Sequence, residues 1–265
     1  MSFKHIVSRD NPVFKQLKKL ADNARERRGE GKTLLDGVHL IESYRETLGE
    51  SGIELVIIPE GKSSVEATGL IQNLEHISTV MLPTLMFAEL TPVASATGIL
   101  ALIKTPQLTL PEAPAFALML EDIQDPGNLG SMLRTAAAAG VEVVYLSTSC
   151  TDAWSPKALR GGQGAQFVLP IRERADLIAE LQQFSGNSYA TTMQGESLYV
   201  QDLTQETVFV IGNEGAGLRK QTIEASSKTI TIPMAKTTLG SVESLNAGAA
   251  AAVCLFERKR QVSLA

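Results

Sequence analysis

The stretch that decides the fold is residues 115–140, AFALMLEDIQDPGNLGSMLRTAAAAG. It opens with an apolar run, which predicts a buried strand, and passes through a loop with two glycines into a helix of small residues. This order of strand, loop and helix is typical of a parallel α/β sheet. Arg134 stands inside the helix, where a segment built for tight packing has no obvious use for a guanidinium.

The same alternation continues to the end of the chain and predicts an α/β domain. We expect a mostly parallel sheet with helices on both faces. Its strands are predicted at 115–122, 141–147, 166–170, 188–192, 207–212 and 228–233, and a last helix at about 244–259. Ligands of such sheets bind beyond the carboxyl ends of the strands, so the loops after residues 122, 212 and 233 are the places to search for a site.

The domain boundary is predicted at the segment KTPQLTLPEAP (104–114), which carries three prolines in eleven residues. We therefore assign residues 1–104 to a first domain, 105–114 to a linker and 115–265 to a second domain. The first domain starts with a helical period over residues 11–28 and continues with short apolar strands alternating with helices. It is predicted to be a small α/β sandwich.

The composition of the 265 residues, 44% hydrophobic and 20% charged, is that of a globular protein that needs no membrane. No apolar run is long enough to span a bilayer, and the first residues are polar, so we expect a cytoplasmic protein. The two cysteines, Cys150 and Cys254, are expected to be buried thiols rather than a disulfide. The three histidines have no metal-ligand spacing, so no metal site is expected.

The charge distribution indicates a localised contact with a polyanion. Residues 1–45 hold 10 Lys and Arg against 6 Asp and Glu, a net charge of +4, whereas the remaining 14 basic and 23 acidic residues give −9. A basic end on an acidic body favours binding of nucleic acid, although a solvated helix face would show the same charges. The candidate RNA-binding residues are Lys15, Lys18, Lys19, Arg25 and Arg28.

The three loops combine glycines with polar residues. In the first, Gly127 and Gly130 permit close backbone approach, and we expect Asn128 to cap the following helix. The second reads VIGNEGAGL (210–218) and surrounds Glu214 with glycines; the third places Ser244 and Asn246 at the start of an Ala/Gly-rich helix. Turn and cap chemistry would explain each loop alone. No loop matches G-x-G-x-x-G or G-x-x-x-x-G-K-[ST], which disfavours the standard dinucleotide and triphosphate sites.

Together, NLGSMLR, IGNEGAGL and IPM…ESLNAGAAAA resemble the three signature motifs of the SpoU (TrmH) family. These are RNA ribose 2′-O-methyltransferases of the SPOUT superfamily, and the resemblance covers residues 115–260. The first half of the chain resembles the ribosomal-protein-like, RNA-binding domain of the family. The resemblance lies in the segments SRDNPVFKQLKKL, LLDGVHLIE and TGILALI. The resemblance implies a C-terminal trefoil knot, which the rarity of threaded loops would otherwise disfavour.

The resemblance also implies S-adenosylmethionine as methyl donor, S-adenosylhomocysteine as its product, RNA as substrate and a homodimer whose interface includes the active site. The residues that it places around the cofactor are Gly212, Asn213, Glu214, Gly217, Ile232, Met234, Ser244, Leu245 and Asn246. The residues that it implies in catalysis are Asn128, Arg134, Glu214, Ser244 and Asn246. The segment Gly161–Gln163 departs from the family's usual small-residue-plus-Met pattern, which leaves its role open.

Arg134 then has three possible roles. A guanidinium has no acceptor and a pKa above about 12, which makes it a poor base, so we favour binding of an RNA phosphate. The general-base role and a structural salt bridge with Glu214 are the alternatives. Ribosomal RNA is favoured over transfer RNA as substrate. A non-catalytic RNA-binding protein and a nicotinamide-dependent oxidoreductase are the competing classes; the retained site residues disfavour the first and the missing glycine fingerprint disfavours the second.

Overall fold

A computed structural model describes residues 3–61, 64–91, 98–235 and 243–264. The chain forms two compact units: residues 1–107 with 154–167, and residues 108–153 with 168–265. The segment 154–167 falls in the second domain by the sequence-based boundary, but the structure groups it with the first unit. Leu159 and Phe167 of this segment are buried in the core of that unit, where the Phe167 ring meets Tyr44 edge-on at 5.2 Å.

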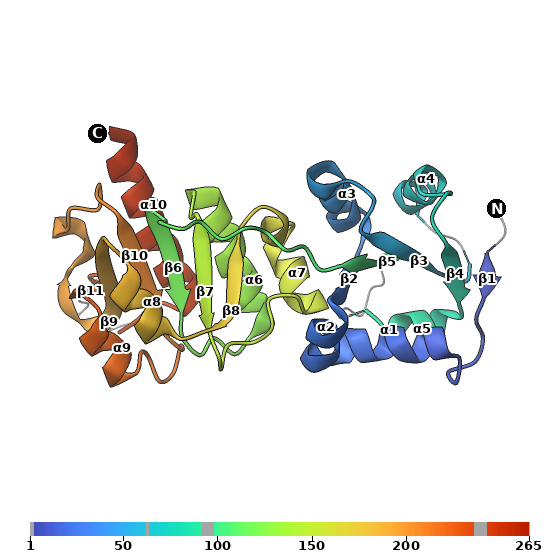
Figure 1. Cartoon of the computed structure of the whole chain (residues 1–265), viewed down its shortest axis with the longest axis horizontal. Helices are drawn as coiled ribbons and strands as arrows, with labels where there is room; N and C mark the ends of the chain where they lie inside the picture. Colours follow the sequence, from blue (N-terminus) through green and yellow to red (C-terminus); the bar gives the residue numbers. More distant parts are fainter. Residues whose placement is uncertain (1–2, 62–63, 92–97, 236–242, 265) are drawn as a thin grey trace. The chain divides into compact units, whose positions relative to one another are not determined.

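The first unit is a five-stranded mixed sheet in the order β1-β4-β3-β5-β2 (Figure 1). Strand β5 is antiparallel to β3 and β2, and β4 is parallel to β1 and β3. The strands are β1 (Lys4–His5), β2 (Lys32–Asp36), β3 (Ile53–Pro59), β4 (Thr79–Leu82) and β5 (Leu100–Lys104). The helices are α1 (Pro12–Asp22), α2 (Ala24–Glu30), α3 (Val38–Leu48), α4 (Val65–Asn73), α5 (Thr84–Ala88) and α7 (Pro156–Gly162).

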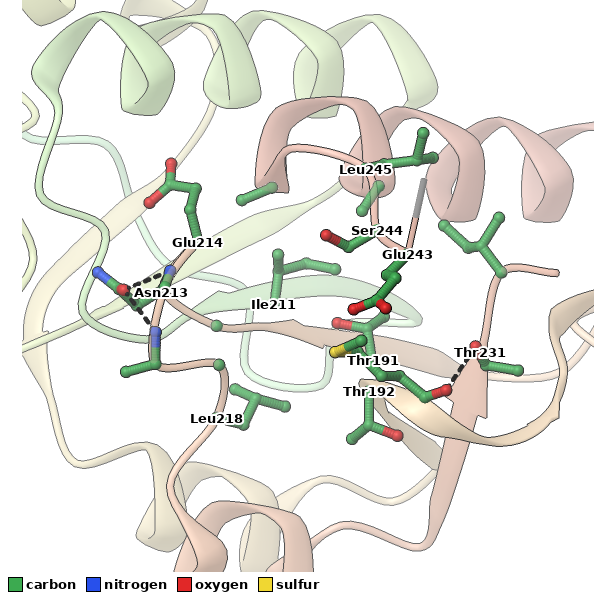
Figure 2. Close-up of a pocket in the computed structure, with 18 of the residues that line it drawn as sticks. Thr191, Thr192, Ile211, Asn213, Glu214, Leu218, Thr231, Glu243, Ser244 and Leu245 are labelled. Carbon is green, nitrogen blue, oxygen red and sulfur yellow. Dashed lines mark hydrogen bonds between the residues drawn. The ribbon is translucent and has the colours of Figure 1, made fainter. Parts of the chain in front are cut away.

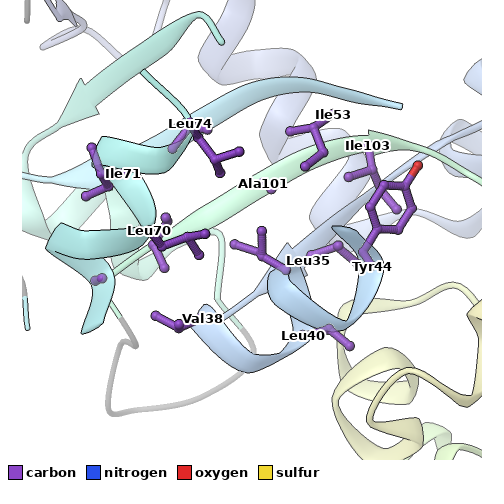
Figure 3. Packing of buried hydrophobic residues seen from close by; sticks show 14 of the residues in the cluster. Leu35, Val38, Leu40, Tyr44, Ile53, Leu70, Ile71, Leu74, Ala101 and Ile103 are labelled. Carbon is purple, nitrogen blue, oxygen red and sulfur yellow. The ribbon is translucent and has the colours of Figure 1, made fainter. Parts of the chain in front are cut away.

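Successive residues of these strands point to opposite faces, which gives the unit two cores. Val56 and Ile58 of β3 pack on one face with residues of α3 and α4. Figure 3 shows part of this cluster, with Tyr44 of α3 and Leu70 of α4 among the labelled side chains. Ile57 packs on the other face with residues of α1 and α5. The helix predicted over 11–28 is interrupted at Asn23, whose side chain accepts the backbone N–H groups of Arg25 and Glu26 and so starts a new helix.

The second unit is a six-stranded, parallel sheet in the order β11-β9-β10-β6-β7-β8. Its strands are β6 (Phe116–Leu120), β7 (Val143–Ser147), β8 (Ile171–Ala175), β9 (Asn187–Ser197), β10 (Thr207–Ile211) and β11 (Lys228–Thr231). Its helices are α6 (Pro126–Ala139), α8 (Leu177–Gln183), α9 (Lys220–Ala225) and α10 (Ala247–Leu264). The predicted parallel α/β class is confirmed.

Helices cover both faces of this sheet. Ala117 and Met119 of β6 pack with Leu177 and Leu181 of α8. Phe116, the residue before Ala117, faces the other way, and the Arg258 guanidinium of α10 lies 4.1 Å from the centre of its ring. The predicted knot depends on the path of the chain between β11 and α10; residues 236–242 of that path lie outside the described residues, so the knot stays a prediction.

One predicted strand is wrong. Residues 166–170 do not form a strand: Ala165–Phe167 is a short 3-10 helix, and the strand begins only at Ile171. The apolar character of this stretch comes from Phe167, which packs in the first unit, and from Leu169. Pro170 lacks a backbone N–H and marks the start of the strand rather than its end. Apolar residues alone cannot show which core they fill.

Candidate active site

The strand order brings two of the three loops together. Strands β6 and β10 are neighbours although they are distant in sequence, and the chain proceeds outward from them in opposite directions, which makes a topological switch point. The Asn213 amide after β10 donates to the Asp122 carbonyl after β6 at 2.9 Å. The Asn128 amide donates to the Glu214 carboxylate at 2.8 Å. Two of the predicted catalytic residues, Asn128 and Glu214, are therefore in direct contact.

A pocket of about 360 Å³ lies at the ends of β10 and β11, beside the middle of β9 and against the start of α10 (Figure 2). Eight of the nine residues predicted to surround the cofactor line it: Gly212, Asn213, Glu214, Gly217, Ile232, Met234, Ser244 and Leu245. Asn246 is not among the lining residues. The second and third loops therefore form one cavity.

Glycines are required where the second loop folds back on itself. A Cβ at Gly212 would lie 2.6 Å from both the Gly217 carbonyl oxygen and the Leu218 amide nitrogen, so only glycine fits without moving the backbone. Gly217 has a φ of +68°, in the region that other residues avoid. Between them, the Asn213 side-chain oxygen accepts the N–H groups of Gly215 and Ala216 at 2.9 and 3.0 Å. The loop is thus held in one shape without a ligand.

Ser244 and Asn246 take different positions at the start of α10. The Asn246 side-chain oxygen accepts the Ala249 N–H at 2.7 Å, which is an N-cap. Ser244 lies in the pocket wall instead. The two side chains differ in this way because residues two apart in sequence do not share a helix face.

Asn128 does not cap α6, contrary to our expectation. The cap is Asp125, whose carboxylate accepts the Asn128 backbone N–H at 2.8 Å, and the helix begins at Pro126. Proline suits this first position because its missing N–H has no helical partner to lose. The earlier start leaves the Asn128 side chain available for Glu214.

Arg134 is exposed on α6 and does not line the pocket. Within the described part of the chain, its guanidinium makes no ion pair or hydrogen bond. The salt bridge with Glu214 that we considered is absent from the described contacts; Glu214 is bonded to Asn128 instead, and in Figure 2 its carboxylate points toward α6. This chain therefore does not bring Arg134 and the pocket together.

Sequence reasoning missed one wall of the pocket. This wall is formed by three residues of β9, namely Thr191, Thr192 and Met193. Glu243, which directly precedes Ser244 in the sequence, also lines the pocket. No sequence motif lies at the end of the predicted strand 188–192. Only its place in a parallel sheet could have indicated that this strand lines the pocket. In Figure 2 the Glu243 carboxylate points into the pocket, and it has no partner among the described residues.

The described wall of the pocket is acidic. It holds two carboxylates, Glu214 and Glu243, and none of its described lining residues is Lys, Arg or His. Carboxylates in a cavity attract a cation and disfavour an anion. This charge is more suitable for a positively charged ligand than for a phosphate.

The five basic residues singled out in the first unit are of two kinds. Lys15 pairs with Asp10 at 2.8 Å, and Lys18 pairs with Asp22 at 2.9 Å and donates to the Glu89 carbonyl. Lys19, Arg25 and Arg28 are exposed, and their side chains contact no acid or carbonyl within the ranges that the structure covers. Only these three have their full charge available to a partner.

The segment Gly161–Gln163 ends α7 in the first unit. Gln163 has a φ of +48° and its side chain donates to the Arg160 carbonyl at 2.6 Å. Both residues line a second cavity, of about 310 Å³, beside the start of α3.

Neither cysteine is in a disulfide; Cys254 is buried as expected, and burial raises the pKa of its thiol to about 12, whereas Cys150 is only half-buried. The described residues contain no group of three or more His, Cys, Asp or Glu that could hold a metal ion. None of the helices described is both long and apolar enough to cross a membrane.

Comparison with known proteins gives the same family as the motifs. Residues 115–256 match the model of the SpoU rRNA Methylase family. The 23S rRNA (guanosine(2553)-2′-O)-methyltransferase RlmP of Bacillus subtilis is 33% identical over 258 residues, 96% of this chain and 98% of the relative. An uncharacterized tRNA/rRNA methyltransferase of Synechocystis is 33% identical over 97% of this chain and 93% of its own length.

A solved structure is similar over both units. The SpoU methyltransferase AviRb from Streptomyces viridochromogenes, in complex with AdoMet, is 26% identical with a TM-score of 0.78, and the match covers 96% of this chain and 100% of that one. The family match, the full-length relatives and the fold agree. This chain belongs to the SpoU rRNA methylase family.

Proposed function

We propose that this protein transfers a methyl group from S-adenosylmethionine to a ribose 2′-hydroxyl of RNA, with ribosomal RNA as substrate. The observation that carries the proposal is the pocket at the switch point, built from the second and third family motifs and joined to the first by the Asn128–Glu214 hydrogen bond. The full-length similarity to a ribosomal RNA 2′-O-methyltransferase supports the choice of RNA.

The pocket fits the proposed cofactor. Its size lies in the range of small-molecule sites. Gly212, Gly215 and Gly217 have no side chains and so present main-chain groups to the pocket, and the two carboxylates complement a ligand with positive charge on its methionine part. We assign the adenine edge to the main chain near Ile232 and Leu245. When bound, the sulfonium would supply an activated methyl group, which the ribose 2′-oxygen would accept in line with S-adenosylhomocysteine as the leaving group.

The residues around the pocket would orient the ribose. Asn128 and Glu214 join the first loop to the second, so the N-terminus of α6 would lie beside the proposed cofactor. Ser244 offers a hydroxyl in the pocket wall. Arg134, charged and without a partner among the described residues, would bind an RNA phosphate and so hold the 2′-hydroxyl in reach of the methyl group.

The protein would act as a homodimer. Arg134 does not line the pocket of its own chain, so a second chain is the natural route by which it would reach a cofactor. Helices α6 and α10 carry Ala and Gly residues that permit close packing, and α10 exposes Phe256 and Val262 at 45% and 44%. Burial of such apolar side chains favours association.

The first unit, together with the linker, would recognise the RNA. Lys19, Arg25 and Arg28 form an exposed basic surface on α1 and α2 that could contact phosphates. We assign this unit to RNA binding and the second unit to methyl transfer, in the cytoplasm.

Mapping of ribose 2′-O-methylation tests the proposal. RNA from cells with and without the gene should differ at one or a few nucleotides of ribosomal RNA, and the purified protein should restore them with S-adenosylmethionine. A difference confined to transfer RNA would move the proposal to that substrate. Identical methylation maps, together with no cofactor binding, would overturn it.

A further inference from the structure

The buried carboxylate of Glu121 has no part in the family motifs quoted above, yet it holds the second loop. Glu121 directly follows β6 and is completely buried. It accepts the Arg219 backbone N–H at 2.7 Å, the Arg219 guanidinium at 2.8 and 2.7 Å, and the Thr222 hydroxyl at 2.6 Å. A carboxylate is buried this deeply only when its oxygens are bonded, and here both are.

Asp122, the next residue, holds the other end of the same loop. Its carbonyl accepts the Asn213 side-chain amide at 2.9 Å. Its own backbone is in the left-handed region, with a φ of 56°, which aspartate adopts more readily than most residues other than glycine. Ser147, buried at the end of β7, is bonded to it in this conformation: its hydroxyl accepts the Asp122 N–H at 3.0 Å and donates to the Asp122 carboxylate at 2.9 Å.

The two anchors enclose the wall of the pocket. Asn213 and Arg219 flank residues 214–218, all five of which line the cavity. Arg219 also stands at the N-cap position of α9, which has no side-chain cap of its own, so the Glu121 carboxylate fixes the end of the loop and the start of the helix at once. The carboxylate raises the pKa of the Arg219 guanidinium in return.

We propose that Glu121 is a positioning residue that, with the Asp122 carbonyl, holds residues 214–218 in the cofactor-binding shape before the cofactor arrives. The inference rests on the proposed function, because the ligand is taken to be S-adenosylmethionine. When the anchor is lost, the loop samples other shapes, and the apparent Kd rises by the inverse of the fraction that remains competent. The number of binding sites per folded chain does not change.

Glu121→Gln is the direct test, because glutamine keeps the size but loses the charge and one of the two acceptors. Calorimetry should give a Kd for S-adenosylmethionine raised roughly tenfold to a hundredfold, with the same stoichiometry. Thr222→Val is the matched control: it removes a hydrogen bond to the same carboxylate but leaves Arg219 in place, so we expect a change below about threefold.

Hydrogen exchange gives a second readout that needs no cofactor. The N–H groups of Gly215, Ala216 and Gly217 are bonded to Asn213. In Glu121→Gln the peptide that covers residues 212–219 should exchange faster, whereas peptides from β7 and β8 should not. If Glu121→Gln does not fold, Arg219→Ala, which removes a guanidinium that is more than half exposed, serves for the same measurements.

The outcomes separate the two proposals. An unchanged Kd and unchanged exchange in a folded Glu121→Gln protein would overturn the positioning role and leave the proposed function intact. A lower stoichiometry with an unchanged Kd would also overturn it, because this pattern indicates a partly unfolded sample. Wild-type protein that binds no S-adenosylmethionine would instead contradict the proposed function.

Discussion

The second loop, which is proposed to bind the cofactor, differs from the basic residues that are proposed to bind RNA. The side chains of the loop have hydrogen-bond partners within the chain, and the basic side chains do not within its described part. In the loop, Asn213, Glu214 and Arg219 all have hydrogen-bond partners within the same unit. Arg134 on α6 and Lys19 on α1 have none within the parts of the chain that the structure covers. Side chains that are hydrogen-bonded in the free protein form a pre-organised pocket, whereas cationic side chains without a partner are available to bind an anionic ligand. The difference predicts which substitutions change cofactor binding and which change only RNA-dependent steps.

The largest effect is expected at Arg134. Arg134→Ala should fold and bind S-adenosylmethionine with a Kd close to that of the wild type, because Arg134 does not line the pocket of its own chain. Single-turnover methyl transfer should fall by about a hundredfold to a thousandfold, the loss expected for one positioned charged donor.

Arg134→Lys is the accompanying variant, because lysine keeps the charge but loses the planar fork. Substantial activity in this variant would indicate charge attraction alone; a loss as complete as in Arg134→Ala would indicate bidentate geometry or proton abstraction. Sedimentation on the same samples reports the dimer. Full activity of a well-folded Arg134→Ala protein would contradict the assignment.

A substitution at Gly212 in the second loop tests the opposite case, in which cofactor binding itself should change. Gly212→Ala should raise the Kd for S-adenosylmethionine roughly tenfold to a hundredfold, because its Cβ would overlap the backbone of Gly217 and Leu218. Gly215→Ala is the matched control: its Cβ would be 3.5 Å from the Asn213 side-chain oxygen, an ordinary contact. Equal affinities of the two variants in calorimetry would show that the loop is not pre-organised as described.

The basic residues of the first unit should separate into two groups. Reversal of Lys19, Arg25 and Arg28 to Glu should weaken RNA binding and flatten the slope of log K against log salt by about 2, at roughly 0.7 per lost contact. Reversal of Lys15 and Lys18, which are paired with acids, should change the slope less. Filter binding over a salt series measures both, and equal slopes in the two variants would contradict the distinction.

The smallest effect is expected for Glu243, which is exposed and faces the pocket. Glu243→Gln should raise the Kd for S-adenosylmethionine by roughly threefold, which is the scale of the loss of an exposed charge pair. Binding of 5′-methylthioadenosine, which lacks both the sulfonium and the ammonium, should not change. Equal weakening of both ligands would assign Glu243 to the adenosine part instead.

The sequence predicts the parallel second unit well because its signals are local. Two apolar runs, at 207–212 and 228–233, directly predict strands β10 and β11. The glycines that follow the runs in the sequence predict that a loop comes after each strand. The motifs likewise predict which residues of these loops line the pocket, since carboxyl ends of parallel strands meet at one edge.

The failures concern contacts between distant residues. The segment 166–170 is apolar because of where Phe167 packs, and periodicity cannot show which unit that is. Asn128 and Asp125 are both acceptable caps, and only the helix start at Pro126 decides between them. Glu121 looks like a polar residue at a strand end; its four bonds come from residues about a hundred positions away.

The salt dependence of the two ligands on one preparation of protein tests the central claim most directly. Asn213, Glu214 and Arg219 of the second loop are bonded within the chain and the basic surface is not, so the Kd for S-adenosylmethionine should change only a few-fold over a salt series. The Kd for the RNA substrate should rise steeply over the same range, because each phosphate contact releases counterions. Parallel changes of the two constants, or an RNA affinity that does not depend on salt, would contradict the account.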